Sequence, residues 1–301
     1  MGLLPPDMEI LPPTDDRVFR VLMTAPEAKP VLMKLIAVVV GRPVVDVTVH
    51  NNELAVSDTQ EKAERFDVNC KTDDGSQVNI EMQASRMEED KGGGHRNFKA
   101  RIIYFLCDLH SSQPSRGQPR YDRLARTWHV TFCSYTVFPH RDGYMNTFSM
   151  RSDEDNELLH DAVRTVIVEL SKLGEVLKKP VDAMTDLEKF SVFLEYAADP
   201  GHRDIVNEVI ESEEVLNVAG NLLMGISQDE KERAIFHSRK KFQMDQASNM
   251  ATAWDNGMKQ KALEVARNAL RMNMSIDDIV KLTGLTHDEV ESLSTTAGIG
   301  A

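Results

Sequence analysis

The sequence is poor in cysteine and has no long apolar run. Among its 301 residues are three cysteines at wide, unpatterned spacing: Cys70, Cys107 and Cys133. An odd number so spaced excludes a disulfide scaffold and a closed cysteine–zinc site. The longest apolar candidate, residues 31–40, contains Lys34 and is far shorter than the roughly 20 residues that a membrane span needs. Residues 1–13 lack the basic region and apolar stretch of an export signal. We therefore expect a cytoplasmic protein without a membrane segment.

Positive charge is also scarce. The chain has 35 Lys and Arg against 48 Asp and Glu, a net charge of −13, which disfavours nucleic acid because phosphates require cations. The charge is uneven, since residues 86–126 contain nine basic and five acidic side chains, a local net charge of +4. An ordinary solvated surface explains this count, and a local basic patch is the alternative interpretation.

Hydrophobic residues make up 41% of the chain, enough for a core in each of one or two domains. A helix is expected to begin at Thr14, Asp15 or Asp16, each of which can cap it, and a second, with Pro30 in its first turn, should end near Gly41. Alternating or β-branched patterns predict strands over residues 44–50, 65–72, 77–84 and 127–138, with weaker candidates at 144–150 and 164–170. A helix is expected over 96–111. We predict an α/β domain over residues 1–180 and an all-helical region over 181–301.

Two neighbouring strands have one apolar and one polar face each, because alternate side chains of a strand share a face. In the first strand the polar face carries Asp67, Asn69 and Lys71. In the second it carries Gln77, Asn79, Glu81 and Gln83.

The connection between the strands decides whether the two polar faces coincide. Residues 73–75 (Asp-Asp-Gly) fit a three-residue loop, a type I turn with glycine in the left-handed conformation. That loop pairs Asp67 with Glu81, whereas a two-residue loop would place Asp67 against the apolar Met82. We therefore favour the three-residue loop.

Asp67 and Glu81 would then lie opposite each other, about 5 Å apart at Cβ. Like charges so placed repel unless a cation lies between them, and oxygen ligands suit Mg²⁺, Mn²⁺ or Ca²⁺. Spacing alone also allows the alternative of a solvent-facing hairpin with hydrated acids.

Asp67 is followed, after thirteen intervening residues, by Glu81-Met82-Gln83. This pattern resembles the PD-(D/E)xK nuclease signature, with Gln in the position usually held by Lys. Residues 16–20, 66–68, 78–83, 101–104 and 121–138 follow the order seen in the PD-(D/E)xK family of transposases and recombination-promoting nucleases. The resemblance implies a restriction-endonuclease-like core, a mixed central sheet flanked by helices, and hydrolysis of DNA in recombination or mobile-element processing.

The resemblance also implies roles for individual residues. Asp67 and Glu81 would ligate Mg²⁺ or Mn²⁺, with the backbone carbonyl of Met82 as a third ligand. Gln83 would hold the attacking water or a phosphate oxygen, although it lacks the charge with which Lys stabilises the transition state. Asp16 would be an accessory acid.

DNA contacts are expected from Arg101, Arg96, Lys99 and Lys71. Arg101 could reach a phosphate or pair with an acid of the site. Two alternative functions stay open: a protein of the same fold that binds DNA without cutting it, and a helical scaffold whose hairpin acids are inert.

The C-terminal segment predicts a helix after Ser275, a turn at Gly284 and a second helix over residues 286–293, a pair that resembles a helix-turn-helix. The second helix is acidic and lacks Arg and Lys, which suits a packing or dimerising pair better than a DNA reader. A long helix within residues 227–271 makes a second copy of the chain a candidate partner.

Overall fold

The computed structural model describes residues 3–50, 68–84, 94–113 and 121–296. They divide into two compact units, Met1–Arg233 and Ala234–Ala301. The helices of the chain are α1 (Asp16–Thr24), α2 (Lys29–Val40), α3 (Gly94–Ser111), α4 (Asp186–Tyr196), α5 (Arg203–Glu211), α6 (Glu214–Gln228), α7 (Glu230–Arg271), α8 (Ile276–Thr283) and α9 (His287–Thr296). The strands are β1 (Val47–Val49), β2 (Val68–Thr72), β3 (Gln77–Gln83), β4 (Thr127–Cys133), β5 (Met145–Arg151) and β6 (Leu158–Glu169).

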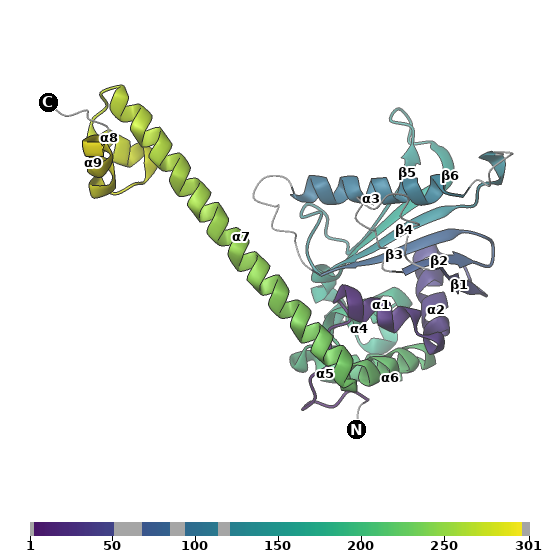
Figure 1. The fold of residues 1–301 in the computed structure, drawn as a ribbon. Helices are drawn as coiled ribbons and strands as arrows, with labels where there is room; N and C mark the ends of the chain where they lie inside the picture. The colour runs from purple at the N-terminus through teal and green to yellow at the C-terminus, as the bar shows by residue number, and fades with distance from the viewer. Residues whose placement is uncertain (1–2, 51–67, 85–93, 114–120, 297–301) are drawn as a thin grey trace. The chain divides into compact units, whose positions relative to one another are not determined.

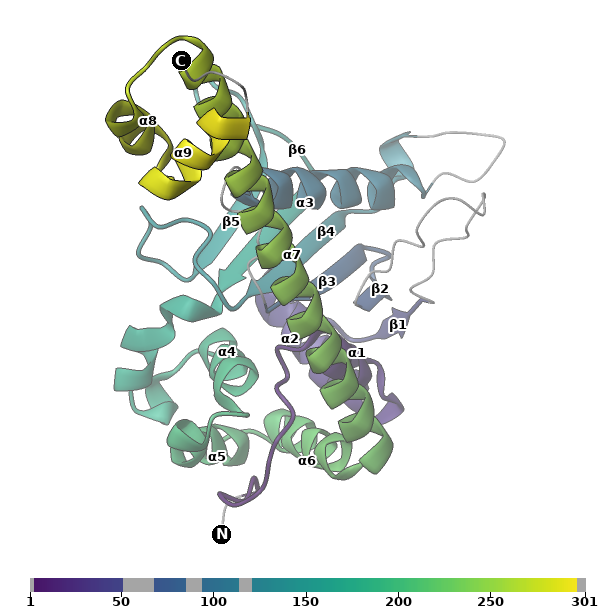
Figure 2. The ribbon, with the colours of Figure 1, turned by 60° about the vertical axis from the view of Figure 1, so that its left-hand side comes forward.

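The first unit is built on a mixed six-stranded sheet in the order β1-β2-β3-β4-β6-β5. β3, β4 and β6 run parallel to one another, and the other neighbours are antiparallel. Helix α3 covers one face of the sheet, and α1 and α2 lie on the other (Figures 1 and 2). This confirms the predicted α/β fold with a mixed central sheet flanked by helices.

The apolar face of the sheet packs against the N-terminal helices. Of the three candidate caps, Asp15 is the residue that begins α1, because its carboxylate accepts from the amides of Arg17 and Val18. The buried ring of Phe19 on α1 lies 6.4 Å from that of Phe132 on β4. α2 ends at Gly41, whose φ of 73° is the left-handed cap that glycine adopts without strain.

The β2–β3 hairpin has the predicted register. Asn69 pairs with Asn79, and the amide of Gly75 donates to the carbonyl of Thr72 at 2.8 Å with a φ of 85° at the glycine. The three-residue loop is therefore confirmed, and with it the common polar face of the described parts of the two strands.

Strand β4 is shorter than the predicted strand 127–138. It ends at Cys133 because the amides of Val137 and Phe138 donate to the buried carboxylate of Glu169 at 2.6 and 2.9 Å, which turns the chain away from the sheet. Long-range contacts of this kind leave no local sequence pattern.

Beyond Lys179 the described residues form helices and their connections, as predicted. Helices α4, α5 and α6 belong to the first unit. There Lys34 of α2 forms an ion pair with Asp186 of α4. This compact unit continues to Arg233, past the predicted core of residues 1–180.

The second unit consists of most of α7 with α8 and α9, joined by a small core of buried residues: Ala266, Ala269, Leu270, Ile279, Leu285 and Val290. The helices end as predicted, with the Ser275 hydroxyl capping α8 and Gly284 closing it at φ 70°. In the described part of the chain, no helix combines the length and apolarity needed to cross a bilayer.

Candidate active site

The polar face of the central sheet is buried beneath α3. On β3 this face carries Asn79 and Glu81, and in the parallel register they lie beside His129 and Thr131 of β4. All four residues are buried. α3 is anchored over them by apolar contacts of Phe98 and Ile102 with residues from the end of β4 and from β6. The hairpin acid therefore lies under a helix rather than on a solvent-facing ribbon.

Glu81 is surrounded by polar groups from three elements. Its Oε1 lies 3.6 Å from Nε2 of His129 and accepts from the side-chain amide of Asn79 at 3.4 Å. Its Oε2 lies 3.9 Å from a guanidinium nitrogen of Arg101 on α3. The side chain of Glu81 is only 9% exposed. These neighbours therefore provide most of the polar interactions that solvent would give an exposed carboxylate.

The carboxyl of Glu81 is held in its charged form. Burial acts to raise the pKa of Glu81, but the imidazole of His129, the charge of Arg101 and the amide of Asn79 act together in the other direction, and the pKa lies below its ordinary value. A buried carboxylate that stays charged is suited to ligating a cation.

Gln83 continues the site toward solvent. Its Oε1 accepts from Arg101 at 2.7 Å, so a single guanidinium bridges Glu81 and Gln83. Arg101 and Gln83 are both partly exposed, which makes this end of the polar face the opening of the site. Of the two roles left open for Arg101, the structure shows pairing with an acid of the site.

His129 is a site residue that sequence reasoning passed over. It is fully buried, its Nδ1 lies 3.3 Å from the hydroxyl of Thr131, and its ring stacks on Phe105 of α3 with centroids 6.4 Å apart. A signal was available, because Thr127, His129 and Thr131 alternate with apolar residues and thus extend the polar face of the hairpin onto a third strand.

The donors around Glu81 fit a divalent cation. Asn79 Oδ1 and His129 Nε2 are both buried and make no hydrogen bond within the described part of the chain. With the carboxylate they form a set of oxygen and nitrogen donors acceptable to Mg²⁺, with the nitrogen better suited to Mn²⁺. Among the residues that the structure describes, no group of three or more His, Cys, Asp or Glu side chains gathers as a complete site.

The structure brings together some of the predicted site residues. Glu81, Gln83 and Arg101 are in contact, whereas Asp67 lies outside the described residues. Asp16 is the exposed first residue of α1, on the helix that packs against the opposite face of the sheet. The side chain of Met82 is buried on that apolar face, and the role predicted for this residue concerns its backbone carbonyl.

The other predicted DNA contacts are distributed over two elements. Lys99 of α3 is exposed and its Nζ lies 4.5 Å from the centroid of the Phe138 ring. Lys71 is exposed on β2 opposite Gln77, about 13 Å along the strand from the level of Glu81. Arg96 lies in α3, but its side chain is outside the described residues.

A second buried acid, Glu169, was not predicted and has a structural role. Its carboxylate accepts from the side chains of Asn146 and Lys172 at 2.8 and 2.9 Å, besides the two amides at the end of β4. Because all these donors are satisfied by one fully buried group, Glu169 fixes the loop that follows the strand bearing His129.

The sheet order, the hairpin register and the buried acid followed by Gln83 define a restriction-endonuclease-like protein of the PD-(D/E)xK class. The model of a family described as "PD-(D/E)XK nuclease family transposase" matches residues 13–253. A second, described as "Rpn/YhgA-like nuclease family, C-terminal HTH domain", matches residues 259–295. The chain therefore belongs to the PD-(D/E)XK nuclease family transposases and ends in a helix-turn-helix domain of the Rpn type. Comparison with curated proteins and with solved structures gives no match.

Proposed function

We propose that this protein is a metal-dependent DNA endonuclease that hydrolyses phosphodiester bonds during recombination or the processing of mobile DNA. The observation that carries the proposal is the charged, buried carboxylate of Glu81, bridged through Arg101 to Gln83 at the open end of the site. Family membership supplies the reaction class.

Asp67 and Glu81 would hold the ion, Mg²⁺ or Mn²⁺, with the carbonyl of Met82 as a third ligand. Support comes from the hairpin, since the pairing of Asn69 with Asn79 is the register on which the prediction for Asp67 and Glu81 rests. A divalent ion at such a site lowers the pKa of a bound water and offsets the charge of the phosphate.

The protein's own groups would bind and orient the phosphodiester. Gln83 lies at the partly exposed end of the site, where the bond from Arg101 to its Oε1 orients the amide toward an entering phosphate. Arg101 neutralises Glu81 in the resting protein, and its partly exposed guanidinium can form a charge-assisted bond with an entering phosphate. Asp16 remains a proposed accessory acid.

The experiment is a supercoiled-plasmid nicking assay with Mg²⁺, Mn²⁺ or EDTA. Glu81→Gln and Asp67→Asn should each abolish metal-dependent nicking while circular dichroism shows that the fold of the natural chain is kept. Glu175→Gln, at a glutamate that is 85% exposed, is the matched control and should cut normally. Undiminished nicking by both site variants would contradict the proposal.

One observation favours a second candidate function, DNA binding without cleavage. Arg101 already places a cation beside Glu81, and Gln83 lacks the charge of the usual Lys. In that case the chain would shift DNA in a gel in Ca²⁺, with an affinity that falls steeply with salt, yet would leave plasmid intact in every metal.

We infer that DNA is the main partner, that Lys99 and the partly exposed Arg101 of α3 are part of its contact surface, and that the protein acts in the cytoplasm. A second copy of the chain is a further partner through the C-terminal helices. Helix α9 itself is a weak phosphate binder, because its residues 287–296 include acids and no Arg or Lys.

A further inference from the structure

His129 has a buried nitrogen that the proposed nuclease reaction does not use. Its side chain is 0% exposed, and Nε2 makes no hydrogen bond within the described part of the chain. Burying a polar atom without a hydrogen bond is costly, and native proteins keep such atoms mainly where an ion, a water or a function accounts for them. The nitrogen is therefore available to a ligand.

This nitrogen faces one oxygen of Glu81. Nε2 lies 3.6 Å from Oε1, while Arg101 approaches the other oxygen, Oε2, at 3.9 Å. Two donors bound to one ion at about 2.1 Å each are about 3.0–3.4 Å apart for bond angles of about 90–110°. Because the observed distance exceeds this range only slightly, a small movement lets Nε2 and Oε1 bind the same ion.

Asn79 supplies a third donor beside them. It pairs with His129 across β3 and β4, and its Nδ2 lies 3.4 Å from Oε1 of Glu81. Its Oδ1 is buried and makes no hydrogen bond among the residues that the structure describes. Rotation of the amide by about 180° exchanges the two atoms and brings Oδ1 to the position beside Oε1. The three donors then converge on one point.

The imidazole is held in the orientation that ligation requires. Its Nδ1 lies 3.3 Å from the hydroxyl of Thr131, and its ring stacks on that of Phe105 at an interplanar angle of 3°. A histidine that ligates a metal usually donates its other N–H to an oxygen, which fixes the tautomer. When Nδ1 donates to Thr131, the lone pair of the ring is on Nε2 and faces Glu81.

The nitrogen discriminates between metal ions. Mg²⁺ and Ca²⁺ are hard cations that take oxygen ligands. Imidazole suits first-row transition ions, and among these Mn²⁺ also binds well to carboxylate and amide oxygens. A set of one imidazole, one carboxylate and one amide oxygen therefore suits Mn²⁺ better than Mg²⁺.

We propose that His129 and Asn79 ligate the ion of the nuclease centre together with Glu81, and that the imidazole makes the centre selective for Mn²⁺ over Mg²⁺ and Ca²⁺. The inference rests on the proposed function, which requires an ion at Glu81 but assigns no part of its binding to β4. In this arrangement β4 contributes a ligand to the centre as well as β3.

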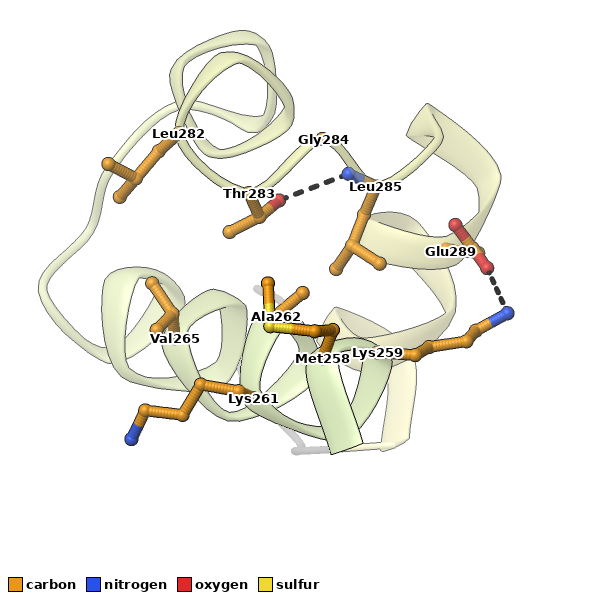
Figure 3. Close-up of a pocket in the computed structure, with 10 residues that line it drawn as sticks. All are labelled: Met258, Lys259, Lys261, Ala262, Val265, Leu282, Thr283, Gly284, Leu285 and Glu289. Carbon is orange, nitrogen blue, oxygen red and sulfur yellow. Dashed lines mark hydrogen bonds and ion pairs between the residues drawn. The ribbon is translucent and has the colours of Figure 1, made fainter. Parts of the chain in front are cut away.

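A second carboxylate provides a contrast, because it has a cationic neighbour but lacks these donors. Glu289 lies at a groove between α7 and the α8–α9 turn, where it forms an ion pair with Lys259 at 2.8 Å (Figure 3). The described residues that line this groove include no histidine, no asparagine and no further acid. Glu289 is therefore a suitable control for the loss of a carboxylate elsewhere in the chain.

The direct test is pulsed electron paramagnetic resonance of the full chain with one equivalent of Mn²⁺. Coordination by an imidazole couples the electron spin to ¹⁴N, and we expect that coupling in the echo modulation. Labelling the chain with ¹⁵N-histidine should replace the ¹⁴N pattern by that of ¹⁵N. This measurement needs no substitution, so it decides the question even if a variant of His129 fails to fold. A ¹⁴N pattern that persists after labelling would overturn the inference.

Variants identify the histidine and measure the selectivity. His129→Gln should remove the nitrogen coupling, weaken Mn²⁺ binding roughly 10–100-fold and weaken Mg²⁺ binding by less than about threefold. Calorimetric titration of Mn²⁺, with and without competing Mg²⁺, gives both constants. His110→Gln is the matched control, because Nδ1 of His110 also lies beside a threonine hydroxyl of β4, that of Thr127 at 2.8 Å, but far from Glu81 along the strand. It and Glu289→Gln should keep the coupling and both affinities.

The outcomes separate this inference from the proposed function. Mn²⁺ that binds to the natural chain but not to Glu81→Gln, without nitrogen coupling, would overturn the inference and leave the nuclease proposal in place. Equal losses of Mn²⁺ and Mg²⁺ affinity in His129→Gln would also overturn it, because a histidine that only positions Glu81 affects both ions alike. Absence of Mn²⁺ binding to the natural chain would contradict the inference and the metal-dependent function together.

Discussion

The ion pair of Arg101 with Glu81 should have a measurable coupling energy. Two unit charges 3.9 Å apart attract by about 4 kcal/mol at an effective dielectric constant of 20. One third of the Arg101 side chain is exposed, so solvent screening reduces the expected coupling to roughly 1–2 kcal/mol.

The assay is a double-mutant cycle with Arg101→Met and Glu81→Gln, unfolded in urea with EDTA present. Trp128, buried on β4, reports on the sheet by fluorescence if Trp254→Phe is introduced throughout. The losses of unfolding free energy in the two single variants should together exceed the loss in the double variant, and the difference is the coupling energy. Additivity of the two losses within about 0.5 kcal/mol would refute the argument that Arg101 compensates the buried carboxylate.

Three further outcomes are expected. Gly75→Ala, at φ 85°, should cost about 1–2 kcal/mol in urea unfolding because the turn requires the left-handed conformation. A loss below about 0.5 kcal/mol would show that the turn does not require that conformation. Glu169→Ala should cost about 3–5 kcal/mol because it leaves three buried N–H donors unsatisfied and removes the carboxylate partner of Lys172, whereas Glu175→Ala should stay within about 0.5 kcal/mol. The pKa of Glu289 is about 2, lowered mainly by the hydrogen bond from Lys259, so its contribution to stability is present above pH 4.5 and is lost as the pH falls toward 2. Lys259→Met should raise the carboxyl titration midpoint seen by NMR, and an unchanged midpoint would contradict the ion pair.

The local part of the fold followed from the sequence. The alternation of residues 77–83 and the glycine of the 73–75 loop were enough to predict the register of the hairpin, because a one-residue shift would have put polar side chains against apolar ones. The caps at Gly41, Ser275 and Gly284 were equally local. In each case the information lies within a few residues of the feature.

The environment of the site did not follow from the sequence. That α3 covers the polar face, and that Arg101 rather than water meets Glu81, depends on which helix packs on which side of the sheet. Glu169 stands at the end of a valine-rich strand, and nothing nearby in the sequence indicates the loop amides that it binds. His129 was within reach, because its strand repeats the alternation of the hairpin.

The account depends most on Glu81 being a ligand for a divalent cation, and calorimetric titration of Mn²⁺ into the natural chain tests this directly. We expect one saturable site per chain, no detectable binding to Glu81→Gln, and tighter binding to Arg101→Met, since the guanidinium and the metal ion compete for the same carboxylate. Absence of binding to the natural chain, or equal binding to Glu81→Gln, would contradict it.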